Sequence, residues 1–355
     1  MNILVIGKFY TEGFALHIAE TLQAMGHEVI RFEPGVKYGN HGGIVATRWR
    51  QVKSAFYELA RKLPSIQGLQ TNRLLRMAGQ DKIQLTMVCY DFLLPNEVQI
   101  LKKITKAPIV LWFPDHIANF QKMCFLNADY DALFFKDPYI THVLGRNLRK
   151  PVFYLPECCN PHCHKFVELS KEDANTYGCE ITTAGNMHSY RAAFFSQLND
   201  YRVKLWGNSP PLWMDISGVK GMMQNQSVFN EDKSKAFRAA KIVINNLQPA
   251  EIWGVNVRTF EIAAAGGFQL IDWRPGLAQL FVDGEELVSF KNMDDLKNKI
   301  DYYLNHEQER LRIAEQGMHR AHQDHTYEKR LKILLETVFN GAHGFPMPDI
   351  PFYHD

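Results

Sequence analysis

Short apolar runs separated by helix-like segments recur along the chain, and this alternation constrains its fold most strongly. The first run, at 3–6 (ILVI), is followed by a helical pattern over about 14–25 that stops at Gly26, and then by a second run at 28–32. These runs are apolar throughout, as expected of parallel strands that helices cover on both faces. A strand, a helix and a second parallel strand form a βαβ unit. The sequence therefore predicts an α/β protein with doubly wound parallel sheets.

The expected elements fall into two groups on either side of a polar break at about 168–177. The first group adds strands at 85–89, 109–113, 132–135 and 152–155, and helices near 96–104 and 139–147. The second has strands at 181–184, 203–206, 242–245, 268–271 and 287–290, helices at 190–198 and 231–240, and amphipathic helices up to about 325. A chain of 355 residues exceeds one typical domain. We predict domains at 1–165 and 166–325, and a last helix and tail, 326–355, that pack back on the first domain.

Composition excludes several classes of protein. A formal net charge of +2 does not indicate a nucleic-acid-binding protein, and no apolar run approaches the roughly 20 residues that cross a bilayer. The first residues lack the features of a signal peptide, so we expect a cytoplasmic protein. Residues 48–76 carry seven basic residues and one acid. This segment is either a solvated helix face or a contact for a membrane or an anionic acceptor.

Parallel α/β sheets bind ligands beyond the carboxyl ends of their strands. Candidate ligand contacts should therefore follow the predicted strands directly. These positions are 7–13, Asp91, Asp115 with His116, Lys136 with Asp137, 185–191, Trp206 with Gly207, and 245–261.

The stretch 251–272 (EIWGVNVRTFEIAAAGGFQLID) carries the clearest chemical signal. It reads as a loop, a short helix opening with Asn256 and Arg258, a stop at Gly266 and Gly267, and a buried strand. An arginine in the first turn opposes the helix macrodipole unless an anion binds there. Glu261 lies one turn further on the same face and could accept bonds from ribose or sugar hydroxyls. The alternative is an exposed i,i+3 ion pair between Arg258 and Glu261.

Three segments of the second half resemble one family: VNVRTFEIAAAGGFQLID, LFVDGEELVSFKNMDDLKNKIDYYL and RIAEQGMHRAHQDHTYEKRL. Together they are similar to the GT-B glycosyltransferases of the group that contains the spore-maturation CgeB-like proteins. The resemblance covers about 180–335, and more weakly 70–160, where NRLLRMAG, VLWFPD and YLPECCNP have counterparts. It implies two Rossmann-like domains facing across a cleft, and transfer of a sugar from a nucleoside-diphosphate-sugar to an unidentified acceptor.

The resemblance also implies residue roles. Glu261 would hold the nucleotide ribose, Arg258 would neutralise the diphosphate, and Asn256 would add a donor. Gly185 and Arg191 look like the glycine and basic residue that reach the phosphates. Fixed positive charge can stabilise the leaving nucleoside diphosphate, so no metal and no cofactor beyond the co-substrate is expected. The other residues assigned to the donor side are Asn186, Trp206, Gly207 and Gly267, although Trp206 and Trp213 could equally be core aromatics.

The chain departs from the family pattern at one position. Many retaining members carry two glutamates separated by seven residues, but counting back from Glu261 gives Trp253. Glu251 could substitute if the loop is longer, and retention of stereochemistry stays open. Asp115 is a candidate general base or orienting acceptor, or simply a helix N-cap. The other candidates on the acceptor side are Gly13, His17, Asp91 and His116, of which Asp91 could also be a cap.

Two further alternatives concern the cysteines and the function class. The cysteines are expected to be thiols, because the spacing in CCNPHCH at 158–164 does not suit zinc. A non-catalytic scaffold that retains nucleotide or glycan binding is the rival function, motivated by Trp253. A nicotinamide-dependent dehydrogenase is disfavoured, because GKFYTEGF lacks the G-x-G-x-x-G spacing.

Overall fold

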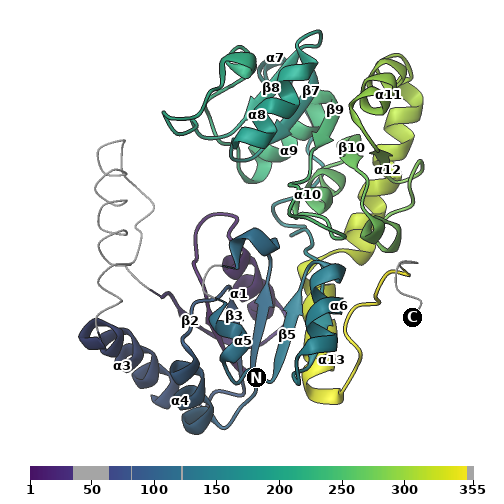
Figure 1. Ribbon diagram of the computed structural model, residues 1–355. Helices are drawn as coiled ribbons and strands as arrows, with labels where there is room; N and C mark the ends of the chain where they lie inside the picture. Colours follow the sequence, from purple (N-terminus) through teal and green to yellow (C-terminus); the bar gives the residue numbers. More distant parts are fainter. Residues whose placement is uncertain (35–63, 81, 121–122, 350–355) are drawn as a thin grey trace. The chain divides into compact units, whose positions relative to one another are not determined.

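A computed structural model of the chain describes residues 1–34, 64–80, 82–120 and 123–349 (Figure 1). The chain divides into two compact units. Unit 1 comprises Met1–Phe135, Ile140–Leu155 and Leu331–Gly344, and unit 2 comprises Lys136–Tyr139, Pro156–Arg330 and Phe345–Asp355. The chain first enters unit 2 at Lys136, returns to unit 1 at Ile140 and passes to unit 2 again at Pro156. The domain bounds 1–165, 166–325 and 326–355 stay a prediction. None of the described helices is long and apolar enough to cross a membrane.

Unit 1 is built on a parallel sheet of six strands with the order β2-β1-β3-β4-β5-β6. Because β1 lies between β2 and β3, the sheet winds in two directions from this point. Figure 1 shows α3 and α4 side by side at one edge of the unit. The strands are β1 (Asn2–Ile6), β2 (Glu28–Phe32), β3 (Leu85–Cys89), β4 (Ile109–Phe113), β5 (Ala132–Phe135) and β6 (Val152–Tyr154), and the helices are α1 (Phe14–Ala24), α3 (Pro64–Gln80), α4 (Pro95–Thr105), α5 (Cys124–Asn127), α6 (Pro138–Asn147) and α13 (Tyr327–Asn340).

Unit 2 contains a parallel sheet of five strands with the order β11-β10-β9-β7-β8. Here β7 lies between β9 and β8, which again gives a switch point. The strands are β7 (Cys179–Ala184), β8 (Val203–Trp206), β9 (Ala240–Asn245), β10 (Gln269–Asp272) and β11 (Val288–Phe290), and the helices are α7 (Lys171–Tyr177), α8 (Ser189–Phe195), α9 (Asn230–Ala239), α10 (Arg258–Ala264), α11 (Met293–Asn305) and α12 (Glu307–Asp324).

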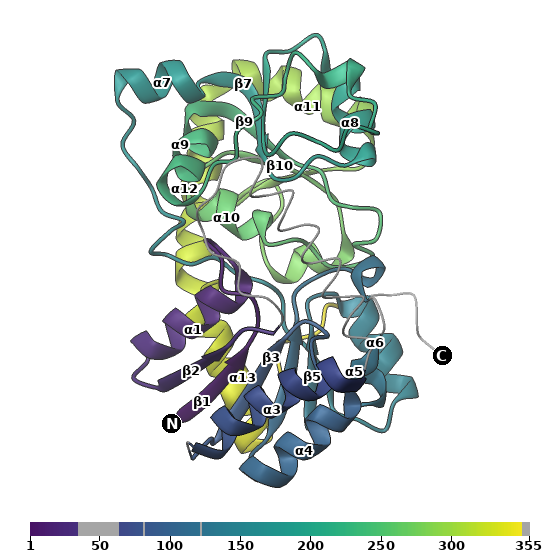
Figure 2. The ribbon, with the colours of Figure 1, turned by 90° about the vertical axis from the view of Figure 1, so that its left-hand side faces the viewer.

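Both faces of the second sheet are buried, which explains why its strands are apolar at consecutive positions. Ile242 and Ile244 pack in one cluster with residues of α8 and α11, whereas Val243 between them packs with residues of α9 and α10. Figure 2 shows α9 and α12 on one side of these strands and α8 and α11 on the other. The predicted doubly wound parallel sheets are confirmed.

The polar break is a correction to the sequence reading. Residues Lys171–Tyr177 form helix α7, and Ser170 caps it: its hydroxyl accepts from Asp173 N at 3.1 Å, while Asp173 accepts from Ser170 N at 3.0 Å. A polar, capped helix lacks the apolar periodicity that reveals buried helices, so the pattern hid it.

The structure describes only part of the basic segment 48–76. Residues 48–63 lie outside the described residues, and the rest belongs to α3. Within α3, the guanidinium of Arg73 lies over the ring of Phe32, 4.8 Å from its centroid. Contact of this segment with a membrane or an anionic acceptor stays a prediction.

Candidate functional site

The site forms where two loops leave the switch point of the second sheet. One loop, 185–188, follows β7 and leads into α8, whose first turn carries Arg191, and the other starts at Asn245, the last residue of the neighbouring strand β9. Arg191 joins the two loops: its Nε donates to Asn246 Oδ1 at 3.2 Å, and its Nη1 donates to the carbonyl oxygen of Asn186 at 2.8 Å. Ligands of doubly wound sheets bind at this position.

Two arginines converge on the backbone of Gly185. A Cβ atom placed on this residue would lie 2.7 Å from Arg258 Nη2 and 3.0 Å from Arg191 Nη1. The residue has φ +135°, a conformation that residues with side chains rarely adopt. The glycine predicted to reach a phosphate is therefore the point where both guanidinium groups meet.

Neither arginine has a carboxylate partner among the described residues. Their acceptors are neutral: Arg258 Nη1 donates to Asn245 Oδ1 at 3.1 Å, and Arg191 donates to the amide oxygens of residues 186 and 246. Burial lowers the pKa of both guanidinium groups. The positive charge of Arg258 lowers the pKa of Arg191 further, whereas nearby glutamates oppose the lowering of the Arg258 pKa. Since arginine stays protonated in proteins, the site holds two charges in need of an anion.

A buried amide beside the arginines is also unsatisfied. Asn246 is 1% exposed, and its Nδ2 has no hydrogen-bond partner among the described residues. Buried polar groups are nearly always hydrogen-bonded, so an orphaned donor at a switch point indicates a ligand or water there.

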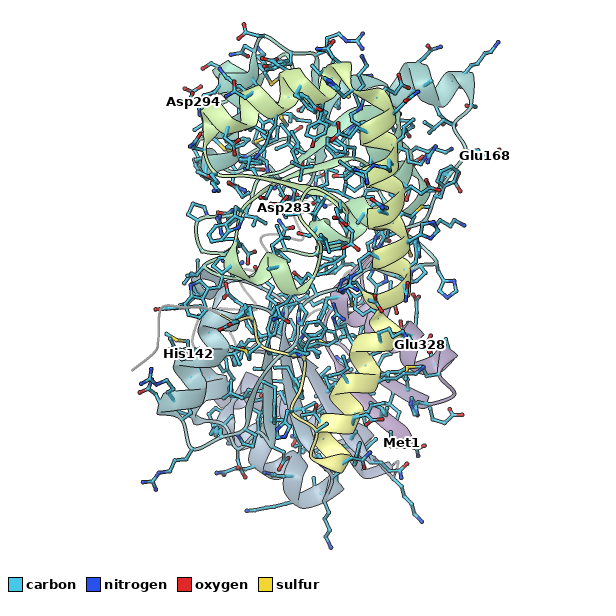
Figure 3. All side chains as sticks on the ribbon, turned by 90° about the vertical axis from the view of Figure 1, so that its right-hand side faces the viewer. Met1, His142, Glu168, Asp283, Asp294 and Glu328 are labelled. Atoms are coloured by element: carbon cyan, nitrogen blue, oxygen red, sulfur yellow. The ribbon has the colours of Figure 1, made fainter. Side chains whose placement is uncertain are left out.

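The start of α10 differs from that of α11. It opens with Arg258, whereas α11 opens with Asp294, labelled in Figure 3, and Asp295, which suit the positive end of a helix. Asn256 supports this start, because its Oδ1 accepts from Thr259 N at 3.3 Å and its Nδ2 donates to Asn245 Oδ1 at 3.1 Å. The structure thus places the predicted ligand donor Asn256 within the protein's own network.

Glu261 lies in a buried charged cluster. Its Oε1 is 3.1 Å from Lys233 Nζ and 3.4 Å from His164 Nε2, and the residue is 8% exposed. Asn160 N donates to His164 Nδ1 at 3.1 Å, so the neutral imidazole carries its proton on the nitrogen that faces the glutamate. The alternative of an exposed Arg258–Glu261 pair is wrong, because Glu261 is buried and the two residues form no ion pair.

Glu251 lies in a second buried cluster. Lys136 Nζ is 2.7 Å from Glu251 Oε1 and 3.3 Å from Glu157 Oε2, and both side chains of the Lys136–Glu251 pair are 3% exposed. Trp253, at the position of the expected first glutamate, stacks edge-on against Tyr139 with ring centroids 5.2 Å apart. Lys136, Lys233, His164 and Asn246 were not assigned to the site from sequence. Of these four residues, only Lys136 and Asn246 could have been found from the sequence, because both directly follow a predicted strand.

Three other residues predicted for the donor side, Trp206, Gly207 and Gly267, have packing roles. Trp206 is 4% exposed and packs against Tyr177, so the core alternative holds for its ring, while Trp213 is 79% exposed. A Cβ on Gly207 would lie 2.4 Å from the carbonyl oxygen of Gly185, so only glycine permits this close approach. Gly267 packs similarly tightly, with Phe237 O and Val243 Cγ2 at 3.2 Å from a Cβ there.

The CCNPHCH segment belongs to the packing of unit 2. The thiol of Cys159 faces the carbonyl oxygen of His325 at 3.1 Å, and burial raises its pKa to about 12. Burial also raises the pKa of the Cys158 thiol. Thiols with raised pKa values are poor metal ligands and poor nucleophiles.

The candidates of unit 1 lie at the carboxyl ends of β3 and β4. Asp91 accepts from Cys124 N at 2.7 Å and from Phe125 N at 3.1 Å, so both of its oxygens hold the start of α5. Asp115 accepts from His116 N at 2.8 Å and from Asn119 Nδ2 at 2.6 Å.

Two further candidates of unit 1 belong to α1. Gly13 precedes this helix, and a Cβ there would lie 2.8 Å from the carbonyl oxygen of Tyr10. His17 is buried within the helix at 3% exposure.

The comparisons with known proteins agree with this architecture. Residues 191–336 match a family model described as glycosyl transferase-like. No curated protein matches the chain in sequence. Sucrose-phosphate synthase from Thermosynechococcus elongatus is 13% identical with a TM-score of 0.66, covering 96% of this chain and 100% of that one. Anabaena HepE in complex with UDP-glucose is 12% identical with a TM-score of 0.64, covering 95% and 100%. The fold is GT-B. Membership of the CgeB-like group stays a prediction.

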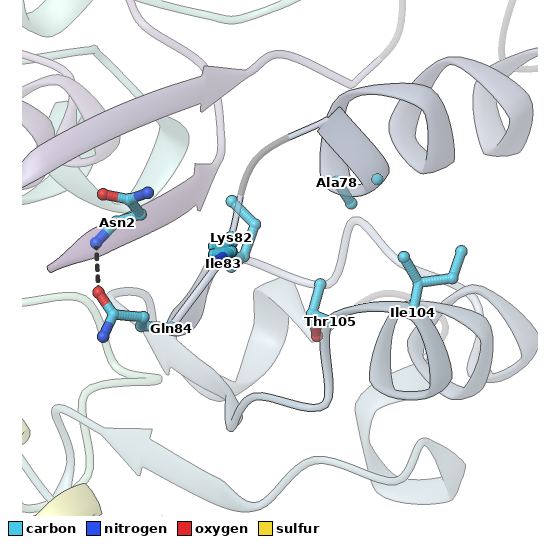
Figure 4. A pocket seen from close by; sticks show the side chains of 8 residues that line it. Asn2, Ala78, Lys82, Ile83, Gln84, Ile104 and Thr105 are labelled. Atoms are coloured by element: carbon cyan, nitrogen blue, oxygen red, sulfur yellow. Dashed lines mark hydrogen bonds between the residues drawn. The ribbon is translucent and has the colours of Figure 1, made fainter.

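A pocket elsewhere in this GT-B chain does not suit a phosphate-bearing ligand. It measures about 560 Å³ and lies at the amino ends of β1 and β3, beside the Asn2 N to Gln84 Oε1 bond of 3.0 Å (Figure 4). Its walls include the carboxyl ends of α3 and α4, at Gly79 and Thr105. Helix carboxyl ends are the negative ends of the macrodipole and repel phosphates.

Proposed function

We propose that this protein is a glycosyltransferase that transfers a sugar from a nucleoside-diphosphate-sugar to a hydroxyl-bearing acceptor. The observation that carries the proposal is the convergence of Arg191 and Arg258 on Gly185 with no carboxylate partner among the described residues. A diphosphate supplies two adjacent negative groups that guanidinium forks bind well. The match of 191–336 to a glycosyl transferase-like model supports the same activity.

The donor class rests on the neighbouring carboxylate and on the structural relatives. Glu261, fixed by Lys233 and His164, is placed in a buried environment where a carboxylate binds ribose hydroxyls well. HepE is described in complex with UDP and glucose, and an E. coli structure with UDP-2-fluoro glucose. We therefore propose a nucleotide sugar as donor, with uridine, guanosine and thymidine all as candidate bases.

The chemistry follows from where charge develops. The bond between the anomeric carbon and the β-phosphate oxygen breaks, and the acceptor oxygen forms the new bond to that carbon. Arg191 and Arg258 would stabilise the departing diphosphate, which makes a metal unnecessary. The acceptor's proton would pass to a base such as Asp115 or to the departing phosphate. Both retention and inversion are compatible with this scheme, and Glu251 is the candidate contact of the sugar.

On the acceptor side we propose His17, His116 and the loop at Gly13, in addition to Asp115. Asp91 is better explained by its two bonds to α5. We further propose that the protein acts in the cytoplasm.

A calorimetric and a kinetic experiment test the proposal together. Wild-type protein is titrated with UDP, GDP and dTDP. It is then incubated with the matching nucleotide sugars, and release of the nucleoside diphosphate is measured. Binding that disappears in Arg258→Ala but persists in Arg310→Ala supports the site, because Arg310 is buried against carbonyls of α11 and serves as a matched control. Absence of binding for all three diphosphates refutes the donor site.

One observation favours the non-catalytic scaffold as second candidate. The glutamate nearest the expected position, Glu251, already pairs with Lys136, and Trp253 occupies the position itself. Diphosphate binding without any release from nucleotide sugars, with and without extracts as acceptor source, would favour this function over transfer.

A further inference from the structure

Lys136 is a buried lysine with an unusual position. It is the first residue after β5, yet Lys136–Tyr139 belongs to unit 2 whereas the strand belongs to unit 1. Its ammonium donates to Glu251 and Glu157, whose side chains are also less than a tenth exposed. Burying three charges is costly even when they are paired, and replacement by apolar residues is often no less stable. Stability alone therefore does not account for this cluster.

Asp137, the residue after Lys136, holds the loop that carries Glu251 by accepting hydrogen bonds from the backbone of that loop. Asp137 Oδ2 accepts from Ile252 N at 2.9 Å and from Trp253 N at 3.2 Å. A Cβ on Gly254 would lie 2.9 Å from the carbonyl oxygen of Lys136, so the loop packs directly on this dipeptide. Arg274 Nε donates to the carbonyl oxygen of Glu251 at 2.7 Å. The backbone that carries the side chain of Glu251 is thus held at several points.

The two carboxylate oxygens of Glu251 have different surroundings. Oε1 accepts from Lys136, but Oε2 has no hydrogen-bond partner among the described residues although the residue is 3% exposed. A buried, charged acceptor without a donor is destabilising. Burial lowers the pKa of Arg258, and the negative charge of Glu251 is among those that oppose this shift, so Glu251 lies within electrostatic range of the anion site.

We propose that Lys136 is a positioning residue: it holds Oε1 of Glu251 so that Oε2 accepts a hydrogen bond from a hydroxyl of the donor sugar. The inference rests on the proposed function and adds how the sugar is recognised. A nucleoside diphosphate lacks the sugar, so it does not engage this oxygen. Binding of the diphosphate alone therefore depends much less on Lys136 than does the additional affinity contributed by the sugar.

The test compares matched ligand pairs by calorimetry. Wild type is titrated with UDP and UDP-glucose, GDP and GDP-mannose, and dTDP and dTDP-glucose, and the tightest pair is used. Glu251→Gln and Lys136→Met should weaken binding of the nucleotide sugar about tenfold or more, the size expected for one bond to a charged group. Binding of the diphosphate should change less than twofold. Lys136→Arg should retain part of the sugar's contribution, because it can still donate to Oε1.

Three controls separate positioning from folding. Glu157→Gln leaves the Lys136–Glu251 bond and should keep the sugar's contribution. Lys299→Met removes another lysine of unit 2, which contacts Asp295 and Ser289 O, and should change neither affinity. If Lys136→Met does not fold, the double variant Lys136→Met, Glu157→Gln is used in its place, because it removes one of the two buried carboxylates that the single variant leaves without a partner.

The outcomes distinguish this inference from the proposed function. Equal weakening of both ligands in Lys136→Met and Lys136→Arg would overturn the inference and indicate a structural role. The inference would also be overturned if the sugar added no affinity in the wild type, or if Glu251→Gln bound the nucleotide sugar as tightly as the wild type. Wild type that binds none of the diphosphates would instead refute the proposed function itself.

Discussion

Two sets of charged residues near the carboxyl ends of the strands, one in each unit, are engaged differently. In unit 1, Asp91 follows β3 and is engaged by two backbone N–H groups of α5, while Asp115 follows β4 and accepts from the next backbone N–H. In unit 2, Arg191 and Arg258 meet at Gly185 with neutral acceptors only, among the described residues. A carboxylate at a strand end can be explained locally. The buried guanidinium of Arg191 and the partly buried one of Arg258 have no such local explanation, so they are the stronger evidence for a ligand.

The largest expected effect tests the unit 2 side of this comparison. Arg258→Ala should weaken diphosphate binding about 100-fold, because charge-assisted bonds to phosphate contribute about 1.5–3 kcal/mol each. Arg258→Lys should also bind more weakly, since it keeps the charge but loses the planar fork. Calorimetry with the tightest diphosphate measures both. Wild-type affinity in Arg258→Lys would argue against a bidentate contact.

The next effect concerns the buried carboxylate of the same unit. Glu261→Ala should weaken donor binding by about 1–3 kcal/mol if the residue accepts ribose hydroxyls. The loss should be smaller for a 2′-deoxynucleoside diphosphate, which offers one hydroxyl fewer. Titration of UDP and dUDP measures this difference. Unchanged affinity for UDP in a folded variant would refute the ribose assignment.

A pH effect on stability is expected from unit 2. Arg330 Nη2 donates to His325 Nδ1 at 2.7 Å, and burial and the positive charge of Arg330 lower the pKa of His325 from 6.5 to about 3. A lowered folded pKa gives stability that is present above pH 6.5 and is lost as pH falls from 6.5 towards about 3. Stability should be about 2 kcal/mol lower at pH 5 than at pH 7 from this group. Urea unfolding of wild type and His325→Asn measures it; an identical pH slope in both would contradict this origin.

The smallest effect tests the unit 1 side. Asp91→Ala should lower the free energy of unfolding by about 1 kcal/mol, the usual value of a lost helix cap, and leave diphosphate affinity unchanged. Urea unfolding and calorimetry on the same variant give both numbers. A loss of affinity as large as that of Arg258→Ala would break the comparison, because a strand-end carboxylate of unit 1 would then act in donor binding.

Local pattern was sufficient for most of the fold. The apolar runs marked β3, β4 and β9 because strands covered on both faces must be apolar at consecutive positions. Helix α7 was missed because its stability comes from the capping of Ser170 and Asp173, which leaves no apolar period. In the site, Arg258 was found from sequence because an arginine in the first turn of a helix is unusual, and Gly185 because it follows a strand and resembles the family's glycine that reaches the phosphates.

The partners of these residues could not be found in the same way. Lys136 and Glu251 are 115 residues apart, and nothing near either residue indicates the other. His164 appeared only as part of a cysteine-rich segment, yet it faces Glu261. Burial decided between the alternatives for Trp206 and for the Arg258–Glu261 pair, and burial is a property of packing.

The sequence alone thus determined the parallel α/β architecture, the ends of most helices and strands, and the helix that carries Arg258 and Glu261. These features follow from interactions between residues close in the chain, which periodicity, glycine positions and caps encode directly. Only the tertiary structure decided which charges meet: the two arginines at Gly185, and the pairing of Lys136 with Glu251. The contacts at Gly185 involve residues that follow β7 and β9, neighbours in the sheet of unit 2, and that strand order is fixed by the packing of the whole unit rather than by any one segment.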